Sequence, residues 1–371
     1  MGGLAHGEPT RKQLHHSASQ AGMRVSVQGL DQRFTPNAVT FMRSLLETAL
    51  SEMVSSEETR GLLPQFNGVY VTDCTRLPWV GGGEKLAVRF ELQHGTLQAS
   101  LSEIHRHDQK TAIIERRLPP AALHLGDLGF FKLKRFQRWN EQGIYWLSRF
   151  KVGTTVMTMD GQVLDLKKAL SGHAEVVIPV KIGAKHSVTA FLVAAPLPEA
   201  AQQQRHKRLK ETARLDQRPI SARQAELANW TIYLTNIPDL NFTQAYTLAR
   251  TRWQIELLFK LWKSHGQILT SRSADPVRQH CEGYAKLLGV LLAHWMLLVT
   301  GWHHPTLGML DALRILRSYV PLLQRTFTDP TLFHTICSWI AHDLAAAPPL
   351  AKRRKAPLAF QLWLQFDFAF P

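Results

Sequence analysis

Apolar residues recur along the 371-residue chain with two different periods, and the period changes near residue 60. Before that point, residues 34–55 carry an apolar stripe at i, i+4 steps with Pro36 near its start, which predicts a helix. After it, apolar and polar side chains alternate, as they do in half-buried strands. We therefore expect a short strand that opens residues 67–77 and reaches Asp73, and strands at 85–93, 97–104 and 144–151. Residues 118–131 are expected to form a strand that enters at a Pro pair and leaves at Asp127-Leu128-Gly129.

Two connecting segments organise these strands. The segment HGT at 94–96 separates two alternating runs and predicts a β-hairpin. The segment LKRFQRWNEQG at 133–143 has helical spacing and ends at Gly143, a residue type that commonly closes helices. A strand, a hairpin, a second strand, a helix and a further strand thus follow one another in the first part of the chain.

The pattern changes between residues 152 and 228, where short strands at 175–182 and 187–195 precede a charged helix at 200–215. Residues 229–238 return to a strand pattern, and the remainder is helical at 243–264, 276–300, 306–323 and 330–346. This order predicts an α/β fold, with a mixed sheet flanked by helices and a β-rich insertion before the helix at 243–264. The expected organisation is a disordered start (1–27), an N-terminal helical segment (28–60), a core in two parts (61–151 and 229–300), the insertion between them (152–228) and a C-terminal helical region (301–371).

Basic residues outnumber acidic ones, with 44 Lys and Arg against 29 Asp and Glu, so the net charge is +15. This surplus favours a polyanionic partner, most commonly nucleic acid, although a basic protein without such a partner stays open. The three cysteines form no CxxC pair, which argues against a disulfide framework and a four-cysteine zinc site. The most apolar run, residues 287–299, is short for a hydrocarbon core of about 30 Å, so we expect a buried helix and no membrane partner.

Three acidic residues are placed where chemistry is commonly found. Asp73 follows the run GVYVT, Asp127 follows LHLG, and Glu256 lies on the helix at 243–264. Functional residues concentrate where strands end, and a helix packed across that edge of the sheet could add a third carboxylate. Three carboxylates without thiols form a hard oxygen site that suits Mg²⁺ or Mn²⁺. Two such ions, about 3.5–4 Å apart, would stabilise both the attacking and the leaving oxygen of a phosphoryl displacement.

Basic residues surround Glu256 on its helix. Arg252 precedes it by four positions and Lys263 follows it by seven, so all three are expected on one helix face. Such a face can hold a phosphodiester backbone, with arginine binding bidentately and lysine acting as a point charge. The alternative is an ordinary surface ion pair between Arg252 and Glu256, and the spacing alone leaves both open. We expect Trp253 to pack in the core, and Trp79 with the following GGG to form a mobile turn.

In these features the chain resembles the DDE transposases of the bacterial insertion-sequence-four (IS-four) family. The resemblance covers about residues 60–300 and rests on the segments VTDCTRLPW, LPPAALHLGDLGFF, GIYWLSRFK, NWTIYLTNIP and RTRWQIELLFKLWKSH. The family signature is a Tyr, two residues, an Arg, three residues, a Glu, six residues and a Lys. Arg252, Glu256 and Lys263 match that spacing, whereas Ala249 stands at the position of the signature Tyr and Tyr246 lies nearly one turn earlier.

The resemblance implies an RNase H-like core in which Asp73, Asp127 and Glu256 are the catalytic, metal-binding acids, and Arg252 and Lys263 bind DNA phosphate. It implies Mg²⁺ or Mn²⁺, as two ions, and double-stranded DNA as partner, both transposon ends and target, with a homodimer forming on the DNA in the bacterial cytoplasm, at the nucleoid. The expected reaction is hydrolysis at transposon ends followed by transfer of the 3′-OH strand into target DNA. Two alternatives remain: an inactive, truncated or domesticated transposase that only binds DNA, and an RNase H-like nuclease without strand transfer.

Overall fold

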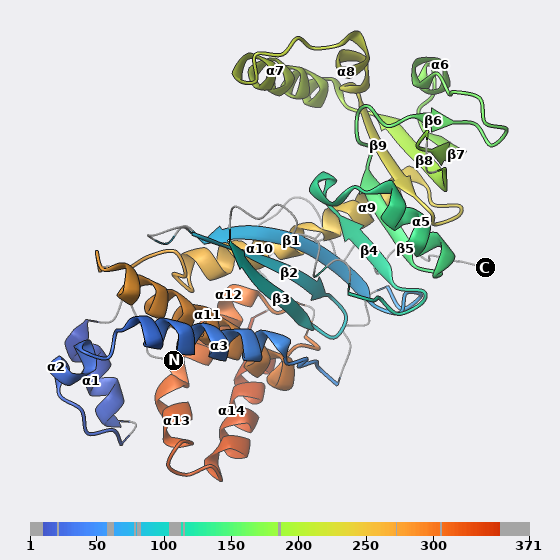
Figure 1. Cartoon of the computed structure of the whole chain (residues 1–371). Helices are drawn as coiled ribbons and strands as arrows, with labels where there is room; N and C mark the ends of the chain where they lie inside the picture. The colour runs from blue at the N-terminus through green and yellow to red at the C-terminus, as the bar shows by residue number, and fades with distance from the viewer. Residues whose placement is uncertain are drawn as a thin grey trace. The chain divides into compact units, whose positions relative to one another are not determined.

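The protein forms two compact units, each assembled from segments that lie far apart in the sequence (Figure 1). Unit 1 comprises Met1–Leu62, Thr72–Arg117 and Trp253–Pro357, and unit 2 comprises Leu63–Val71, Leu118–Arg252 and Leu358–Pro371. The structure is a computed structural model, and it describes residues 10–20, 22–57, 63–77, 79, 83–103, 113, 116–184, 187–271, 273–304 and 306–348.

Unit 1 combines a hairpin with most of the helices. Strand β1 (Val69–Leu77) begins in unit 2 and continues into unit 1, where the strand order is β3-β2-β1. The other elements of unit 1 are α1 (Arg11–Gln20), α2 (Val27–Asp31), α3 (Pro36–Ser51), β2 (Glu84–Glu91), β3 (Leu97–Glu103), α10 (Trp253–Ser264), α11 (Pro276–Thr300), α12 (Met309–Ser318), α13 (Val320–Arg325) and α14 (Leu332–Ala346).

The hairpin of β2 and β3 confirms the predicted pair of strands around HGT. The two strands pair antiparallel, from Glu84 opposite Glu103 to Phe90 opposite Leu97. Gly95 in the turn has a φ of +77°, and a Cβ there would lie 2.3 Å from Leu298. The turn is therefore packed directly against the end of α11, and the Gly95 carbonyl accepts a hydrogen bond of 2.7 Å from His294 on that helix.

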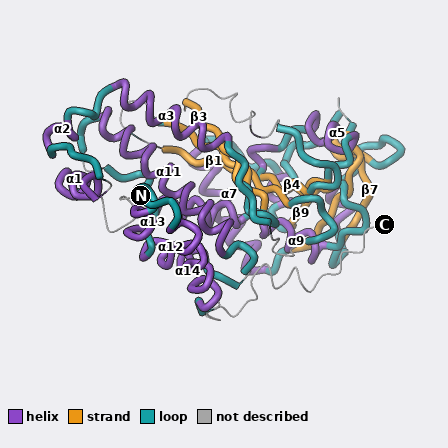
Figure 2. The backbone as a smooth tube through the Cα atoms, turned by 90° about the horizontal axis from the view of Figure 1, so that it is seen from below, coloured by secondary structure: helices purple, strands orange, loops and turns teal. Residues whose placement is uncertain are grey.

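Helix α11 is the centre of unit 1. It packs against α3, α12 and α14, and α3 in turn packs on β3; Figure 2 shows α12, α13 and α14 lying beside one another. A helix that is apolar on nearly every side needs this kind of cover. Among the described residues, α11 alone is long and apolar enough to cross a membrane, but 67% of its most apolar stretch is buried inside the structure. That burial is the property of a core helix, as predicted for residues 287–299.

Unit 2 contains a mixed sheet. Strands β4 (Leu123–Gly126) and β5 (Tyr145–Arg149) are parallel, whereas β5 pairs antiparallel with β9 (Trp230–Thr235). The order continues as β9-β8-β7-β6 through antiparallel pairs, with β8 at Val188–Pro196, β7 at Val176–Ile182 and β6 at Val156–Met157. Its other elements are η3 (Leu128–Phe130), α5 (Leu133–Glu141), α6 (Leu166–Leu170), α7 (Glu199–Leu215), α8 (Ala222–Leu227) and α9 (Phe242–Thr251).

Aromatic packing holds α5 against this sheet. The rings of Phe136 and Trp146 are stacked with centroids 4.0 Å apart, and the Trp146 indole N–H donates to Asn140 at 2.8 Å. The strands predicted at 175–182 and 187–195 are present as β7 and β8; β8 pairs with β9 and β7 with β8, so they extend the sheet of unit 2. The mixed sheet flanked by helices is confirmed, and the strands of the insertion do not form a separate sheet.

Several predicted elements differ in length. The strand predicted at 118–131 is limited to β4 and is followed by the 3₁₀ turn η3. The helix predicted at 243–264 is divided into α9 and α10 at Arg252, and the helix at 306–323 is divided into α12 and α13. A helix, α1, lies inside the start predicted to be disordered, while residues 1–9 of that start and the KRRK block at 352–355 lie outside the described residues.

Candidate active site

Asp73 lies within β1, in the part of the strand that belongs to unit 1. The sequence places it at the end of a strand, and this is wrong, because β1 continues for four more residues to Leu77. The continuation follows from apolar packing, since Thr75 and Leu77 are buried on one face. Asp73 itself is half-buried, and its Oδ1 accepts a hydrogen bond of 2.7 Å from the backbone N–H of Cys74.

Asp127 follows directly after β4, as the sequence predicts, and it belongs to unit 2. It occupies the N-cap position of η3, where aspartate side chains usually accept a hydrogen bond from the next turn. Its carboxylate makes no such bond; only its backbone carbonyl accepts one, from Phe130 at 2.9 Å. The half-buried carboxylate therefore remains available for a ligand.

Glu256 lies in the first turn of α10 and is half-buried. The rotation of this helix is fixed by its buried face, which Glu256 flanks and which consists of Ile255, Leu258, Phe259 and Trp262. Lys263 lies in the last turn, seven residues after Glu256 and therefore on nearly the same face. Both charges are also favourable for the helix dipole, which contributes about 0.3–1 kcal/mol each at exposed sites.

Arg252 does not belong to the helix of Glu256. It caps the C-terminus of α9 in an αR conformation, at the point where unit 2 ends and unit 1 resumes. Ala249 lies half-buried on α9, one turn from the exposed ring of Tyr246. Tyr246 is stacked on Phe242 with centroids 6.0 Å apart, and the guanidinium of Arg250 lies 5.8 Å from its centroid. The ring of Tyr246 is thus held by neighbours on α9.

Trp79 connects the elements that carry Asp73 and Glu256. It follows β1 by two residues, is 6% exposed, and donates its indole N–H to the carbonyl of Ile268 at 3.0 Å, four residues after α10. The ring also packs edge-on against Tyr284 of α11, at 5.2 Å between centroids. The prediction of a mobile turn is therefore wrong for Trp79; Gly81 and Gly82 lie outside the described residues.

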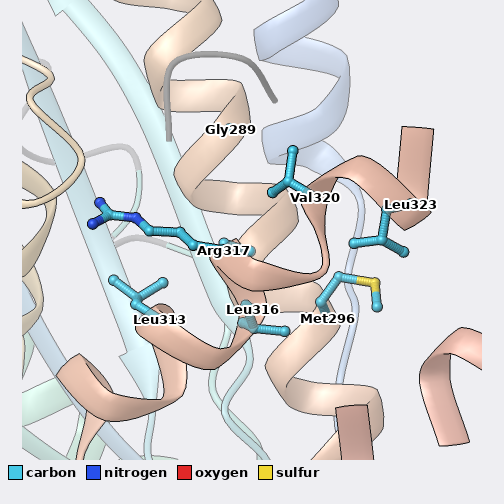
Figure 3. Close-up of a pocket in the computed structure, with 8 residues that line it drawn as sticks. Gly289, Met296, Leu313, Leu316, Arg317, Val320 and Leu323 are labelled. Carbon is cyan, nitrogen blue, oxygen red and sulfur yellow. The ribbon is translucent and has the colours of Figure 1, made fainter. Parts of the chain in front are cut away.

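Arg317 holds the far end of α10. Its guanidinium donates to the carbonyl of His265, one residue beyond the helix. The arginine lines a cavity of about 20 Å³ whose other walls are apolar residues of α11, α12 and α13. Figure 3 shows the guanidinium extending away from Met296, Val320 and Leu323. Sequence reasoning missed this residue, because nothing in the local pattern relates α12 to the end of α10.

Trp253 contradicts the expectation of a core tryptophan. It is the first residue of α10 and is 59% exposed. A signal for this was present in the sequence, since the face defined by Ile255, Leu258, Phe259 and Trp262 leaves Trp253 on another side of the helix. The exposed indole lies three residues before Glu256.

The chemistry of the three predicted acids fits a hard divalent cation, since all are oxygen ligands. The structure brings Asp73 and Glu256 into one compact unit and assigns Asp127 to the other. Within the described part of the chain, no three His, Cys, Asp or Glu side chains are grouped closely enough to hold a metal ion. Metal binding by these three residues therefore stays a prediction.

Comparison with known proteins identifies the class to which this fold and these residues belong. Residues 84–292 match the family model described as the transposase DDE domain. That match covers more than half of the chain, so the chain belongs to the DDE transposase family. The matched range contains Asp127 and Glu256, whereas Asp73 precedes it.

Individual relatives agree with this assignment. The chain is similar to the transposase for insertion sequence element IS231F of Bacillus thuringiensis subsp. israelensis, with 26% identity over 73% of this chain and 65% of the relative. It is also similar to the transposase for IS231E of Bacillus thuringiensis subsp. finitimus (25% identity, 76% of this chain and 66% of the relative). The transposase for IS1151 of Clostridium perfringens is 23% identical over 72% of this chain and 65% of its own length. The chain thus spans just under two thirds of the length of these relatives.

Proposed function

We propose that the protein is a DNA transposase that hydrolyses DNA at transposon ends and transfers the freed 3′-OH strand into target DNA. The observation that carries this proposal is the transposase DDE match over residues 84–292, which includes two of the three candidate acids. The oxygen-only character of those acids and the net charge of +15 support the same activity. The protein would act in the bacterial cytoplasm, as a homodimer on its DNA.

In this proposal Asp73, Asp127 and Glu256 hold two Mg²⁺ or Mn²⁺ ions. When bound, such ions activate the attacking oxygen and stabilise the leaving oxygen of a phosphodiester. The half-buried carboxylates of Asp127, which makes no capping hydrogen bond to η3, and of Glu256 are suited to this role. The proposal requires the three carboxylates to converge on the same pair of ions.

Lys263 and Arg252 would hold the DNA backbone. Lys263 is two helical turns from Glu256, about 10 Å along the axis of α10. Phosphates follow one another every 3.4 Å along the axis of each strand, so this lysine would contact a phosphate a few nucleotides from the cut. Arg252, at the end of α9, would bind phosphate bidentately.

The test is metal-dependent cleavage of a labelled duplex that carries the DNA ends flanking the coding sequence. We expect the wild-type protein to cleave with Mg²⁺ or Mn²⁺, and Glu256→Gln and Asp127→Asn to lose at least about 1,000-fold in rate, since a metal ligand supplies several kcal/mol. Glu141→Gln, an exposed acid at the end of α5, is the matched control and should cleave normally.

Each outcome has a definite meaning. Normal cleavage by a folded Glu256→Gln variant would contradict the assignment of the third acid. Tight DNA binding without cleavage by the wild-type protein would instead favour an inactive DNA-binding relative, with Ala249 as the first position to restore to Tyr. Cleavage without joining of the 3′-OH strand to a second duplex would favour a nuclease.

A further inference from the structure

Helix α7 of unit 2 presents an exposed row of cations that plays no part in the candidate active site. The helix contains five Lys or Arg residues against two Glu, a net charge of +3 within 17 residues. It has no fully buried residue, and Figure 1 shows it with α8 beyond the ends of β8 and β9. A helix this polar is not stabilised by packing in a hydrophobic core. Its cationic surface is therefore a candidate binding surface.

Polar contacts on one side fix the rotation of α7. Gln202 donates to the carbonyl of Leu197 at 2.7 Å, and His206 is hydrogen-bonded to Asn229 at 2.7 Å. Arg205 donates to the carbonyl of Trp230 on β9. Because these contacts lie on the side facing β9, the remaining surface of the helix is directed to solvent.

Lys207, Lys210 and Arg214 lie along that surface. They are all exposed, and their i, i+3, i+7 spacing places them within a narrow stripe. Successive members are about 4.5 and 6 Å apart along the helix axis. Across the described residues, no carboxylate is ion-paired with any of the three, although Glu211 lies on the same side of the helix.

We propose that this row, Lys207–Lys210–Arg214, is a binding surface for the phosphate backbone of double-stranded DNA. The proposal rests on the proposed transposase function, which supplies the DNA. A duplex carries one charge per strand every 3.4 Å of axis, so a cationic row about 10 Å long matches roughly three phosphates. A row of flexible cations that contacts only phosphates would bind any sequence, and would hold DNA without selecting the transposon ends.

The test compares salt dependence of binding to a random-sequence duplex, using the full chain and fluorescence anisotropy. The variant is the triple substitution Lys207→Gln, Lys210→Gln and Arg214→Gln, which keeps good helix formers in α7. Three lost phosphate contacts should weaken binding at least about tenfold near 50 mM salt and reduce the slope of log K against log salt by about 2 to 3. The matched control removes the same charge from three other exposed lysines, Lys12, Lys167 and Lys168.

The control triple should keep the wild-type slope. An unchanged slope in the α7 variant, with circular dichroism showing a folded protein, would overturn the inference. Cleavage of terminal DNA by the wild-type protein is measured in parallel. If it is present while the α7 variant keeps its slope, only the role of α7 fails; if the wild-type protein neither binds nor cleaves DNA, the transposase proposal fails with it.

Discussion

At the scale of single residues, the two tryptophans near the candidate acids show that burial of a side chain depends on its tertiary surroundings. Trp79, in a segment predicted to be mobile, is buried, while Trp253, predicted to be buried, is 59% exposed. The two tryptophans thus differ in burial. The helix face decides this for Trp253, and a partner far away in the sequence decides it for Trp79. For Trp79 that partner is Ile268, 189 positions later in the chain, which no local pattern can indicate.

Replacing Trp79 by Phe tests this connection. The substitution keeps an aromatic ring against Tyr284 but removes the N–H that reaches the buried carbonyl of Ile268. We expect a loss of about 1–3 kcal/mol in the free energy of unfolding, because a buried acceptor is left unpaired. Urea denaturation followed by fluorescence at two protein concentrations would measure it. Trp253→Phe is the matched control and should change stability by less than about 0.5 kcal/mol; an equal loss in both variants would show that the hydrogen bond is unimportant.

At the scale of elements, the alternating and helical patterns predicted the hairpin of β2 and β3, the strands of the sheet in unit 2, and helices α3, α5, α7, α11 and α14. The patterns failed where tertiary structure determines the residue at which a helix or strand ends. Residues 243–264 have one continuous helical pattern, yet the chain leaves α9 at Arg252 and begins α10 at Trp253, where the two units meet along the chain. This helix boundary coincides with the division of the chain into units, which a local helical pattern does not indicate.

Arg317 provides a prediction about α10 as an element. Burial lowers the pKa of its guanidinium, and its donation to the His265 carbonyl caps a helix end that would otherwise lack a partner. In Arg317→Met the side chain fits the apolar cavity, but the carbonyl loses its donor. We expect faster hydrogen exchange in the last turn of α10 and a loss of about 1–2 kcal/mol in stability.

The matched control for that variant is Arg314→Met on the same helix. Arg314 is exposed, and among the described residues its ion pair is with Asp311, at 2.8 Å, so its loss should leave exchange in α10 unchanged. Hydrogen–deuterium exchange measured by mass spectrometry resolves the peptide that contains Lys263 and His265. Equal protection of that peptide in both variants would contradict the capping role of Arg317.

At the scale of the whole molecule, each compact unit combines segments that lie far apart in the sequence. Unit 1 takes α3 and the β2–β3 hairpin from the first third of the chain and α10 to α14 from the last third. Local periodicity carries no information about such distant pairings. For the same reason, the three acids could be chosen from the sequence while their convergence could not be derived from it.

This division predicts how fragments of the chain behave. Residues 118–252 contain β4 to β9 and α5 to α9. Of the described residues of unit 2 they lack only Leu63–Val71, which supplies the Gly68 carbonyl that accepts from Leu123 at 2.9 Å. We therefore expect this fragment to fold alone, with a cooperative urea transition at a lower urea concentration than in the full chain.

Residues 253–348 contain α11 without α3 or the β2–β3 hairpin that packs against it. Their apolar surface would be exposed, so this fragment should aggregate. Size-exclusion chromatography and circular dichroism of both fragments would test these expectations. A 253–348 fragment that is soluble and unfolds cooperatively would contradict them, and so would a 118–252 fragment without an unfolding transition. Either result would show that the compact units do not fold independently. If both expectations hold, strands β4 to β9, with Asp127 directly after β4, fold from one continuous stretch, whereas the surroundings of Asp73 and Glu256 require both ends of the protein.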